Sequence, residues 1–475
     1  MHRMNCFLIW LLLFFISPVL ICTTGCRKIV GVDPPPNRIT SAQVFSNDST
    51  ATQALIGIYN QIMGTFGILN GNGTLLCGEY ADELVPTPVT DKDEPFFTDE
   101  LTAKDDQVGG IWKNVYQYIY SCNDVIQGLE NNKAVSQGLR DQLLGEARFL
   151  RAVGYFYMIN LFGDVPLVTV TDYTGNAKMG RTPVRDVYEQ IITDLKEAQN
   201  LLPANYYTNA AYPYQRIRAN KLAATALLAR VYLYKKDWAA AETAATQVVE
   251  SPLYKLETDV QQVFLTTGKE VILQFMSVSR FNTAEGFLFV PQNGFAPAYI
   301  LTDSLLAAFE PDDKRRQWIR TDTVNGVAYH SPYKYRRNDD RQPFTEYNTV
   351  LRLGEQVLIR AEARIMQNNL AGAADDLSLL RARASLAAIG PFTSQSAAMA
   401  ALEHERRIEL FAEWGHRWFD LNRWQPQNSS SPSFTTRADE VMSCCKHPWK
   451  PTAKLWPIPA NELQLNPALI QNTGY

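Results

Sequence analysis

The segment from Leu143 to Val168 constrains the fold more than any other part of this 475-residue chain. Small or apolar residues recur there every three or four positions, which is the spacing of one helical face: Ala147, Leu150, Gly154, Met158 and Leu161. The opposite face is also apolar, so we expect a buried helix. Gly163 and Pro166 predict its end. Because Ala147 and Gly154 are small, another helix can pack closely against this central scaffold helix.

An internal repeat supports a fold of paired helices. Residues 228–241 and 360–373 superpose at a constant offset, and both predict a helix, a tight turn and an Ala-rich second helix. The turns contain Lys236-Asp237 and Asn368-Asn369. This is the layout of tetratricopeptide units. With residues 143–202 and 397–424, it predicts a mostly α fold of about four tetratricopeptide-like helix pairs and a few short strands.

Two stretches lack helical periodicity. Residues 67–106 are rich in Gly, Asn, Pro and acidic residues, and residues 254–350 are irregular apart from a strand-like run at 271–275. Long irregular segments in a compact protein are commonly functional. Aromatic side chains on such loops can stack against the apolar face of a sugar ring. Packing of the same aromatics into the core is the alternative.

Helix boundaries are predicted at two further places. Thr182 is expected to cap a helix that has Pro183 in its first turn. The C-terminal portion predicts one long helix from Ala398 to Trp424, in which Glu413 and Arg417 have the i, i+4 spacing of an ion pair.

Composition narrows the class of function. The chain is 46% hydrophobic and 20% charged, as expected for a globular protein. Its formal net charge is −4, and it has no long Lys/Arg run. Both features argue against nucleic-acid binding as the main task.

The N-terminal region has the pattern of an export signal. His2 and Arg3 precede an apolar run that is too short for a convincing membrane span. The run leads to Thr23-Thr24-Gly25-Cys26, which resembles the bacterial lipoprotein cleavage box, although Thr23 replaces the usual Leu. We expect residues 1–25 to be the signal peptide and Cys26 to be lipidated, with palmitate among its acyl chains. Residues 26–40, which are rich in proline, would form an extended tether. A plain secretory signal is the alternative.

Signals for metals and cofactors are weak, and none is predicted. Cys444-Cys445-Lys446-His447 has no second ligand pair at a zinc spacing, so a thiol pair in a loop is the preferred interpretation. Asp91, Asp93 and Glu94 could hold calcium, but a solvated acidic loop is favoured.

Several motifs occur in an order that spans most of the chain. They are Glu146–Ala152 with Gly163–Leu167, Thr182-Pro183 before Val187-Tyr188, Leu351–Glu355 with Ala361–Ala363, Glu405–Leu410 with Arg417–Trp424, and Leu455–Pro459 with Asn472–Tyr475. Together they resemble the SusD/RagB family of nutrient-binding outer-membrane lipoproteins of Bacteroidetes.

The resemblance implies a SusD-like domain over residues 41–475, with an N-terminal part (41–250) and a C-terminal part (251–475). It implies a mostly helical fold of tetratricopeptide-like pairs with a loop-rich ligand face. It also implies a lipid anchor in the cell outer membrane, display at the surface and a role in polysaccharide utilisation. The implied partner is a SusC-type TonB-dependent β-barrel transporter. Ligands in the family are usually glycans, held by aromatic stacking and polar contacts without catalysis. Arg27-Lys28 departs from the acidic stretch that follows the cysteine in many surface-displayed members.

The matched motifs do not contain the binding site, so its residues are expected in the two irregular stretches. The first stretch contributes Asn70, Asn72, Tyr80, Phe96 and Phe97, and the second contributes Phe281, Asn282, Phe287, Phe289, Asn293, Phe295 and Tyr299.

Catalysis is not predicted. A glycoside hydrolase needs two carboxylates that face each other across a sugar. Glu413 and Asp420 would instead project from one helix face, about 10.5 Å apart along the axis. The alternative function is a peptide-binding or purely structural tetratricopeptide-like protein of the outer membrane.

Overall fold

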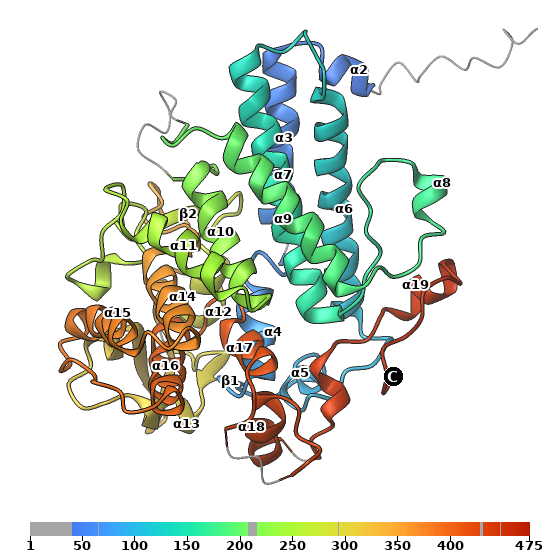
Figure 1. The fold of residues 1–475 in the computed structure, drawn as a ribbon. Coiled ribbons are helices and arrows are strands. Elements are labelled where there is room, and N and C mark those ends of the chain that lie inside the picture. The colour runs from blue at the N-terminus through green and yellow to red at the C-terminus, as the bar shows by residue number, and fades with distance from the viewer. Residues whose placement is uncertain (1–39, 65, 208–215, 293, 428–430, 447) are drawn as a thin grey trace, which may run out of the picture. The chain divides into compact units, whose positions relative to one another are not determined.

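The computed structural model describes residues 40–64, 66–207, 216–292, 294–427, 431–446 and 448–475 (Figure 1). The predicted signal peptide, Cys26 and nearly all of the tether lie outside these residues. Residues Phe45–Tyr475 form one compact unit, and the short helix α2 (Ser41–Val44) belongs to the other unit. No helix in the described ranges is both long and apolar enough to cross a bilayer.

Helices dominate the larger unit, which confirms the predicted fold class. The main helices are α3 (Asp48–Met63), α6 (Asp106–Leu129), α7 (Gln137–Phe162), α9 (Val184–Leu201), α10 (Lys221–Tyr234), α11 (Trp238–Val249), α14 (Leu353–Met366), α15 (Leu370–Arg383) and α16 (Gln395–Leu410). Successive helices pack side by side, so that α3, α6, α7 and α9 form one bundle and α10, α11, α14, α15 and α16 continue it (Figure 1). Three of the roughly four predicted pairs are α7/α9, α10/α11 and α14/α15. The region predicted for the fourth contains α16 and the short helix α17 (His416–Arg423).

The internal repeat extends to the turn geometry. Lys236 and Asn368, at equivalent positions, both have positive φ, at 63° and 61°. The next residues, Asp237 and Asn369, both cap the second helix by accepting a hydrogen bond from the backbone N–H three residues on. The two helical hairpins therefore have the same backbone geometry at the turn.

Helix α7 is the buried scaffold helix that the sequence predicts. It ends at Phe162, and Gly163 follows with φ 71°. A Cβ on Gly154 would overlap the Tyr118 ring of α6, so only glycine permits this approach of the two helices. The buried Arg151 donates to Asp194 of α9 at 2.6 and 2.8 Å and to Asn123 of α6 at 2.7 Å. Polar pairing thus supplements apolar packing on both sides of α7.

Two predicted boundaries are wrong. Helix α9 begins after Pro183, and its first N–H is capped by Asp164 Oδ1 at 2.8 Å, because Thr182 pairs with Val165 in a β-bridge. The predicted helix 398–424 is broken between α16 and α17 (His416–Arg423). At the break, Trp414 has φ 52° and donates its N–H to Thr74 Oγ1 at 3.1 Å. Tertiary contacts override the helical pattern there.

The strands are short and form three antiparallel pairs among the described residues: β1 (Leu84–Pro86) with β3 (Tyr299–Leu301), β2 (Val271–Phe275) with β6 (Asn348–Arg352), and β4 (Ile319–Val324) with β5 (Val327–Pro332). The strand predicted at 271–275 is confirmed. The remaining short helices are α4 (Asn72–Tyr80), α5 (Glu94–Phe97), α8 (Tyr173–Asn176), α12 (Ala284–Phe289), α13 (Asp303–Ala308), α18 (Arg437–Cys445) and α19 (Ala460–Leu465). Short 3-10 turns are η1 (Val260–Gln262), η2 (Lys314–Trp318) and η3 (Pro451–Lys454).

The cysteines that the structure describes are free thiols. Cys77 and Cys122 are buried. Cys444 and Cys445 are exposed and end helix α18, which corrects the interpretation of these two as part of a loop.

A buried ion network joins the strands to the C-terminal helices. Arg352, at the end of β6, donates to Glu409 Oε1 at 2.6 Å and to Glu413 Oε2 at 2.8 Å. Arg383 of α15 and Arg315 also contact Glu409. Burial alone would raise the pKa of Glu409, but the three guanidinium groups more than offset it and hold that pKa well below its usual range. The sequence had predicted an ion pair between Glu413 and Arg417. That prediction is wrong, because Glu413 pairs with Arg352, and Arg417 pairs with Glu403.

We predict that Arg352→Met lowers the free energy of unfolding by about 3–5 kcal/mol, because it leaves Glu409 and Glu413 buried with less compensating charge. The shift in the urea midpoint, followed by tryptophan fluorescence, measures this loss. Arg185→Met is the control, since Arg185 pairs with Asp186 on the surface. That variant is expected to change stability by less than about 0.5 kcal/mol. Equal midpoints for the two variants would contradict the role of the network.

Candidate ligand-binding site

Three stacked phenylalanine rings form an exposed surface that we term the phenylalanine platform: Phe66, Phe281 and Phe287. The ring centroids of Phe281 and Phe287 lie 4.7 Å apart with an interplanar angle of 21°, and those of Phe66 and Phe281 lie 5.9 Å apart at 29°. Phe287 is 50% exposed and Phe66 is 41% exposed. Large aromatic surface is normally buried, so a cluster left open to solvent marks a surface for binding.

The platform joins two segments that are more than 200 residues apart in sequence. Phe66 follows α3. Phe281 precedes α12, and Phe287 lies within it. Gly71, with φ 87°, lets the two approach, because a Cβ there would lie 2.8 Å from the Ala284 Cβ. Thr283 caps α12 by accepting from the Gly286 N–H at 2.9 Å.

A buried carboxylate anchors α12 to the core. Glu285 accepts from Thr74 Oγ1 of α4 at 3.2 Å and from Asn348 Nδ2 of β6 at 2.9 Å. Burial raises the pKa of Glu285 to about 6, although these hydrogen bonds oppose the shift. Since Thr74 Oγ1 also accepts from Trp414, the platform is tied to the break between α16 and α17. The rings are therefore held on a fixed support.

The predicted asparagines support the backbone around the platform. Asn72 Nδ2 donates to the Phe66 carbonyl at 2.9 Å, and Asn70 Nδ2 donates to the Met63 carbonyl at 3.0 Å. Asn282 is buried and accepts from the Thr345 N–H at 2.9 Å. Asn293 lies outside the described residues. The hydrogen-bonding capacity that the sequence assigned to a ligand is thus largely used within the protein.

The predicted aromatics divide into buried and accessible groups. Tyr80, Phe96 and Phe289 are in the core. Tyr80 packs edge-on against Trp418 at 4.7 Å, and Phe96 packs in the same way against Trp456 at 5.3 Å. These three rings cannot reach a solute, so their prediction as ligand contacts is wrong. They pack in the core, as the alternative interpretation had it. Phe295 is 68% exposed and can contact a ligand.

Phe97 and Tyr299 have intermediate exposure. The Lys446 ammonium nitrogen lies over the Phe97 ring, 4.4 Å from the ring centroid. The Tyr299 hydroxyl donates to Asp93 Oδ1 at 3.1 Å. Phe66, the ring that sequence reasoning missed, stands one residue before the predicted loop; its position at the end of a helical pattern gave no separate signal.

The predicted loop over residues 67–106 is partly wrong, because it contains α4. This helix is buried nearly all round and therefore shows no amphipathic period. Asp93 is itself buried and takes part in hydrogen bonds with Thr90 and Tyr299. Within the described ranges, no group of three or more His, Cys, Asp or Glu side chains is arranged to hold a metal ion.

The carboxylates considered for catalysis are engaged in ion pairs. Glu413 belongs to the buried network, and Asp420 accepts from Arg406 at 2.6 Å. Both carboxylates are therefore already paired with arginine guanidinium groups.

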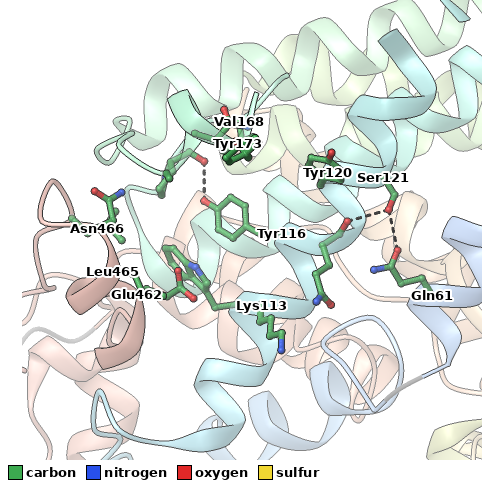
Figure 2. Close-up of a pocket in the computed structure, with 16 residues that line it drawn as sticks. Gln61, Lys113, Tyr116, Tyr120, Ser121, Val168, Tyr173, Glu462, Leu465 and Asn466 are labelled. Atoms are coloured by element: carbon green, nitrogen blue, oxygen red, sulfur yellow. Dashed lines mark hydrogen bonds between the residues drawn. The ribbon is translucent and has the colours of Figure 1, made fainter. Parts of the chain in front are cut away.

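Apart from the platform, the structure has a hollow that we term the α6 groove, with a volume of about 740 Å³ (Figure 2). It lies between three elements: α6, the segment around α8, and α19. Its lining includes Trp112, Tyr116 and Tyr120 of α6, Tyr173 of α8, and Glu462 and Leu465 of α19. None of the residues predicted for the ligand site lines it.

Comparison with known proteins covers both halves of the chain. A family model described as starch-binding and associating with the outer membrane matches residues 77–233, and the model of the SusD family (SusD_RagB) matches residues 310–475. The chain belongs to the SusD/RagB family. The predicted association with the outer membrane is thereby confirmed.

Relatives and solved structures agree with this assignment. SusD-like protein P25 of Formosa agariphila is 24% identical over 95% of this chain and 97% of its own length. Starch-binding protein SusD of Bacteroides thetaiotaomicron is 32% identical over 26% of this chain and 22% of its own length. The structure of surface glycan-binding protein A from Bacteroides uniformis superposes with a TM-score of 0.75 at 22% identity, covering 90% of this chain and 99% of that one. A SusD superfamily protein from Bacteroides vulgatus gives the same TM-score at 20% identity, with the same coverage of both chains.

A buried carboxyl group in α4 makes the free energy of unfolding depend on pH. Glu79 of α4 is fully buried, and its carboxylate oxygens have no hydrogen-bond partner among the described residues. Burial, with Asp93 adding to it, raises the pKa of Glu79 from 4.5 to about 9. Between these values the folded protein keeps a proton that the unfolded chain loses, so stability falls as pH rises from about 4.5 to 9.

We predict that Glu79→Gln raises the free energy of unfolding at pH 8 by at least about 1 kcal/mol and has little effect at pH 4.5. Urea midpoints measured from pH 4.5 to 9 test this, and the slope for the variant should be shallower. Burial also raises the pKa values of Glu83 and Glu346 to about 7, so some slope remains. The exposed Glu100 supplies the control: Glu100→Gln should follow the wild-type profile. A parallel profile for Glu79→Gln would refute the assignment.

Proposed function

We propose that this protein captures a glycan chain on the phenylalanine platform without catalysis and delivers it to a SusC-type TonB-dependent transporter. The observation that carries the proposal is the set of three stacked rings on a rigid support, of which Phe66 and Phe287 are exposed and Phe281 is half-buried. The apolar face of a sugar ring can lie on such a surface, as other flat, partly apolar rings do.

The comparisons support the ligand class. One relative is named as a starch-binding protein and one structural neighbour as a surface glycan-binding protein. Phe281 and Phe287, which the sequence singles out, take part in the platform, and Phe66 completes it. We include Phe295 as a further contact because its ring is the most exposed of the predicted set.

The anchor and the partner belong to the same proposal. Residues 1–25 act as the signal, Cys26 carries the lipid, and residues 26–40 tether the domain formed by the rest of the chain. Multiple acyl chains give a firm anchor, at about 0.8 kcal/mol per buried methylene. An anchored binding protein that is held beside a transporter raises the local concentration of ligand at the transporter.

We predict that the double substitution Phe281→Ala/Phe287→Ala weakens glycan binding by about tenfold or more, because it removes two of the three stacking surfaces. The full chain in detergent is titrated calorimetrically with oligosaccharides from starch, xylan and β-glucan. Tyr207→Ala is the matched control, since Tyr207 is an exposed aromatic outside the platform. Unchanged affinity in the double variant would exclude the platform. Binding of peptides with no binding of any glycan would favour the peptide-binding alternative.

A second prediction concerns the anchor and the partner. Affinity-tagged full chain purified from its native outer membrane should bring with it a TonB-dependent β-barrel, identified by mass spectrometry. Cys26→Ser should abolish labelling with an alkyne analogue of palmitate and release the protein from the membrane. A wild-type protein that is unlabelled, soluble and free of any barrel would refute this part of the proposal.

A further inference from the structure

The α6 groove has the lining of a ligand site and lacks an occupant within the described chain. Tyr173 is 81% exposed, Tyr120 is 47% exposed and Leu465 is 78% exposed. Among the lining residues, the Tyr116 hydroxyl donates to the Pro166 carbonyl at 2.8 Å, which fixes the position of its ring (Figure 2). Its volume of about 740 Å³ falls within the range of small-molecule sites.

The polar groups of the groove favour a neutral, hydroxyl-rich ligand. Its charged lining residues are one lysine and one glutamate, Lys113 and Glu462, so their formal charges cancel. Amide side chains make up much of the remaining polar lining, including Gln61, Gln117 and Asn176. Amides both donate and accept hydrogen bonds, which suits hydroxyl groups. Gln61 Oε1 accepts from the Ser121 hydroxyl, and Asn176 Nδ2 donates to the Val170 carbonyl at 2.9 Å. An apolar peptide face would bury the remaining donors and acceptors of these amides without partners, at a cost in affinity.

The groove approaches the segment of the chain that carries Phe66 of the phenylalanine platform. Gln61 and Gln117 line the groove and also line a smaller hollow of about 60 Å³ that Gly67 borders. Gly67 directly follows Phe66, the α3-side ring of the platform. The Ser121 hydroxyl donates to Gln61 Oε1 at 3.2 Å and so fixes this junction between α3 and α6 (Figure 2).

We propose that the α6 groove is a second subsite for the neutral glycan chain that the platform holds, reached past Gln61 and Gln117. The inference rests on the proposed function, from which it takes the ligand class. Tyr120 and Tyr173 provide the stacking surfaces, and the amides bind sugar hydroxyls. Two linked subsites make affinity depend on chain length, because only a longer oligomer engages both.

The test compares chain-length series on the full chain in detergent. Maltose to maltooctaose, and the corresponding xylo- and cello-oligosaccharides, are titrated against wild type and Tyr120→Ala/Tyr173→Ala. For the series that binds, wild type should gain affinity with length. The double variant should lose that gain, by about tenfold or more for the longest member, while its affinity for the shortest binding member is unchanged. Tyr120→Phe/Tyr173→Phe keeps the rings and should restore the gain.

The outcomes separate the two proposals. If the double variant binds long oligomers as wild type does, the groove is not a subsite, whereas the platform proposal stands. If Phe281→Ala/Phe287→Ala leaves short-oligomer binding intact, the platform proposal fails independently. If no series binds to wild type, both are overturned. Tyr207→Ala controls for loss of an exposed ring elsewhere.

Discussion

The pairing of Arg352 with Glu409 and Glu413 is the interaction on which the C-terminal half depends. It joins β6 to the end of α16 in a buried site, where neither charge can remain alone. Glu413 reaches Arg352 because the chain leaves the helix after Leu410. The same departure brings Trp414 to Thr74, and Thr74 binds the Glu285 carboxylate beneath the platform. The ion network, the helix break and the phenylalanine platform are thus parts of one connected arrangement.

Sequence reasoning predicted the helices well where their patterns are long and repeated. Helix α7 ends at Gly163 as expected, and both repeat hairpins turn at the expected residues. Local patterns suffice in these places, because each helix buries a continuous apolar stripe against its sequence neighbours.

The failures share a physical cause. Helix α4 is buried on all sides, and the 411–415 segment bends to meet partners more than 300 residues away in sequence, such as Thr74. Contacts of that range leave no periodic trace in the local sequence. The phenylalanine platform posed the same difficulty. Phe281 and Phe287 were singled out, but pairing them with Phe66 required the fold. Asn70, Asn72 and Asn282 proved to bind the backbone. No residue of the α6 groove could be found without the packing of α19 near α6.

The support beneath α12 has a consequence for how such proteins diversify. Asn348 and Thr74 hold Glu285 on the buried side of the helix, whereas Phe287 is half exposed. Under the proposed function, recognition and folding therefore depend on different side chains of the same short segment. Exchange of the outward rings for other flat groups would change which sugars are preferred and leave the scaffold unaltered. One architecture could then bind many different glycans.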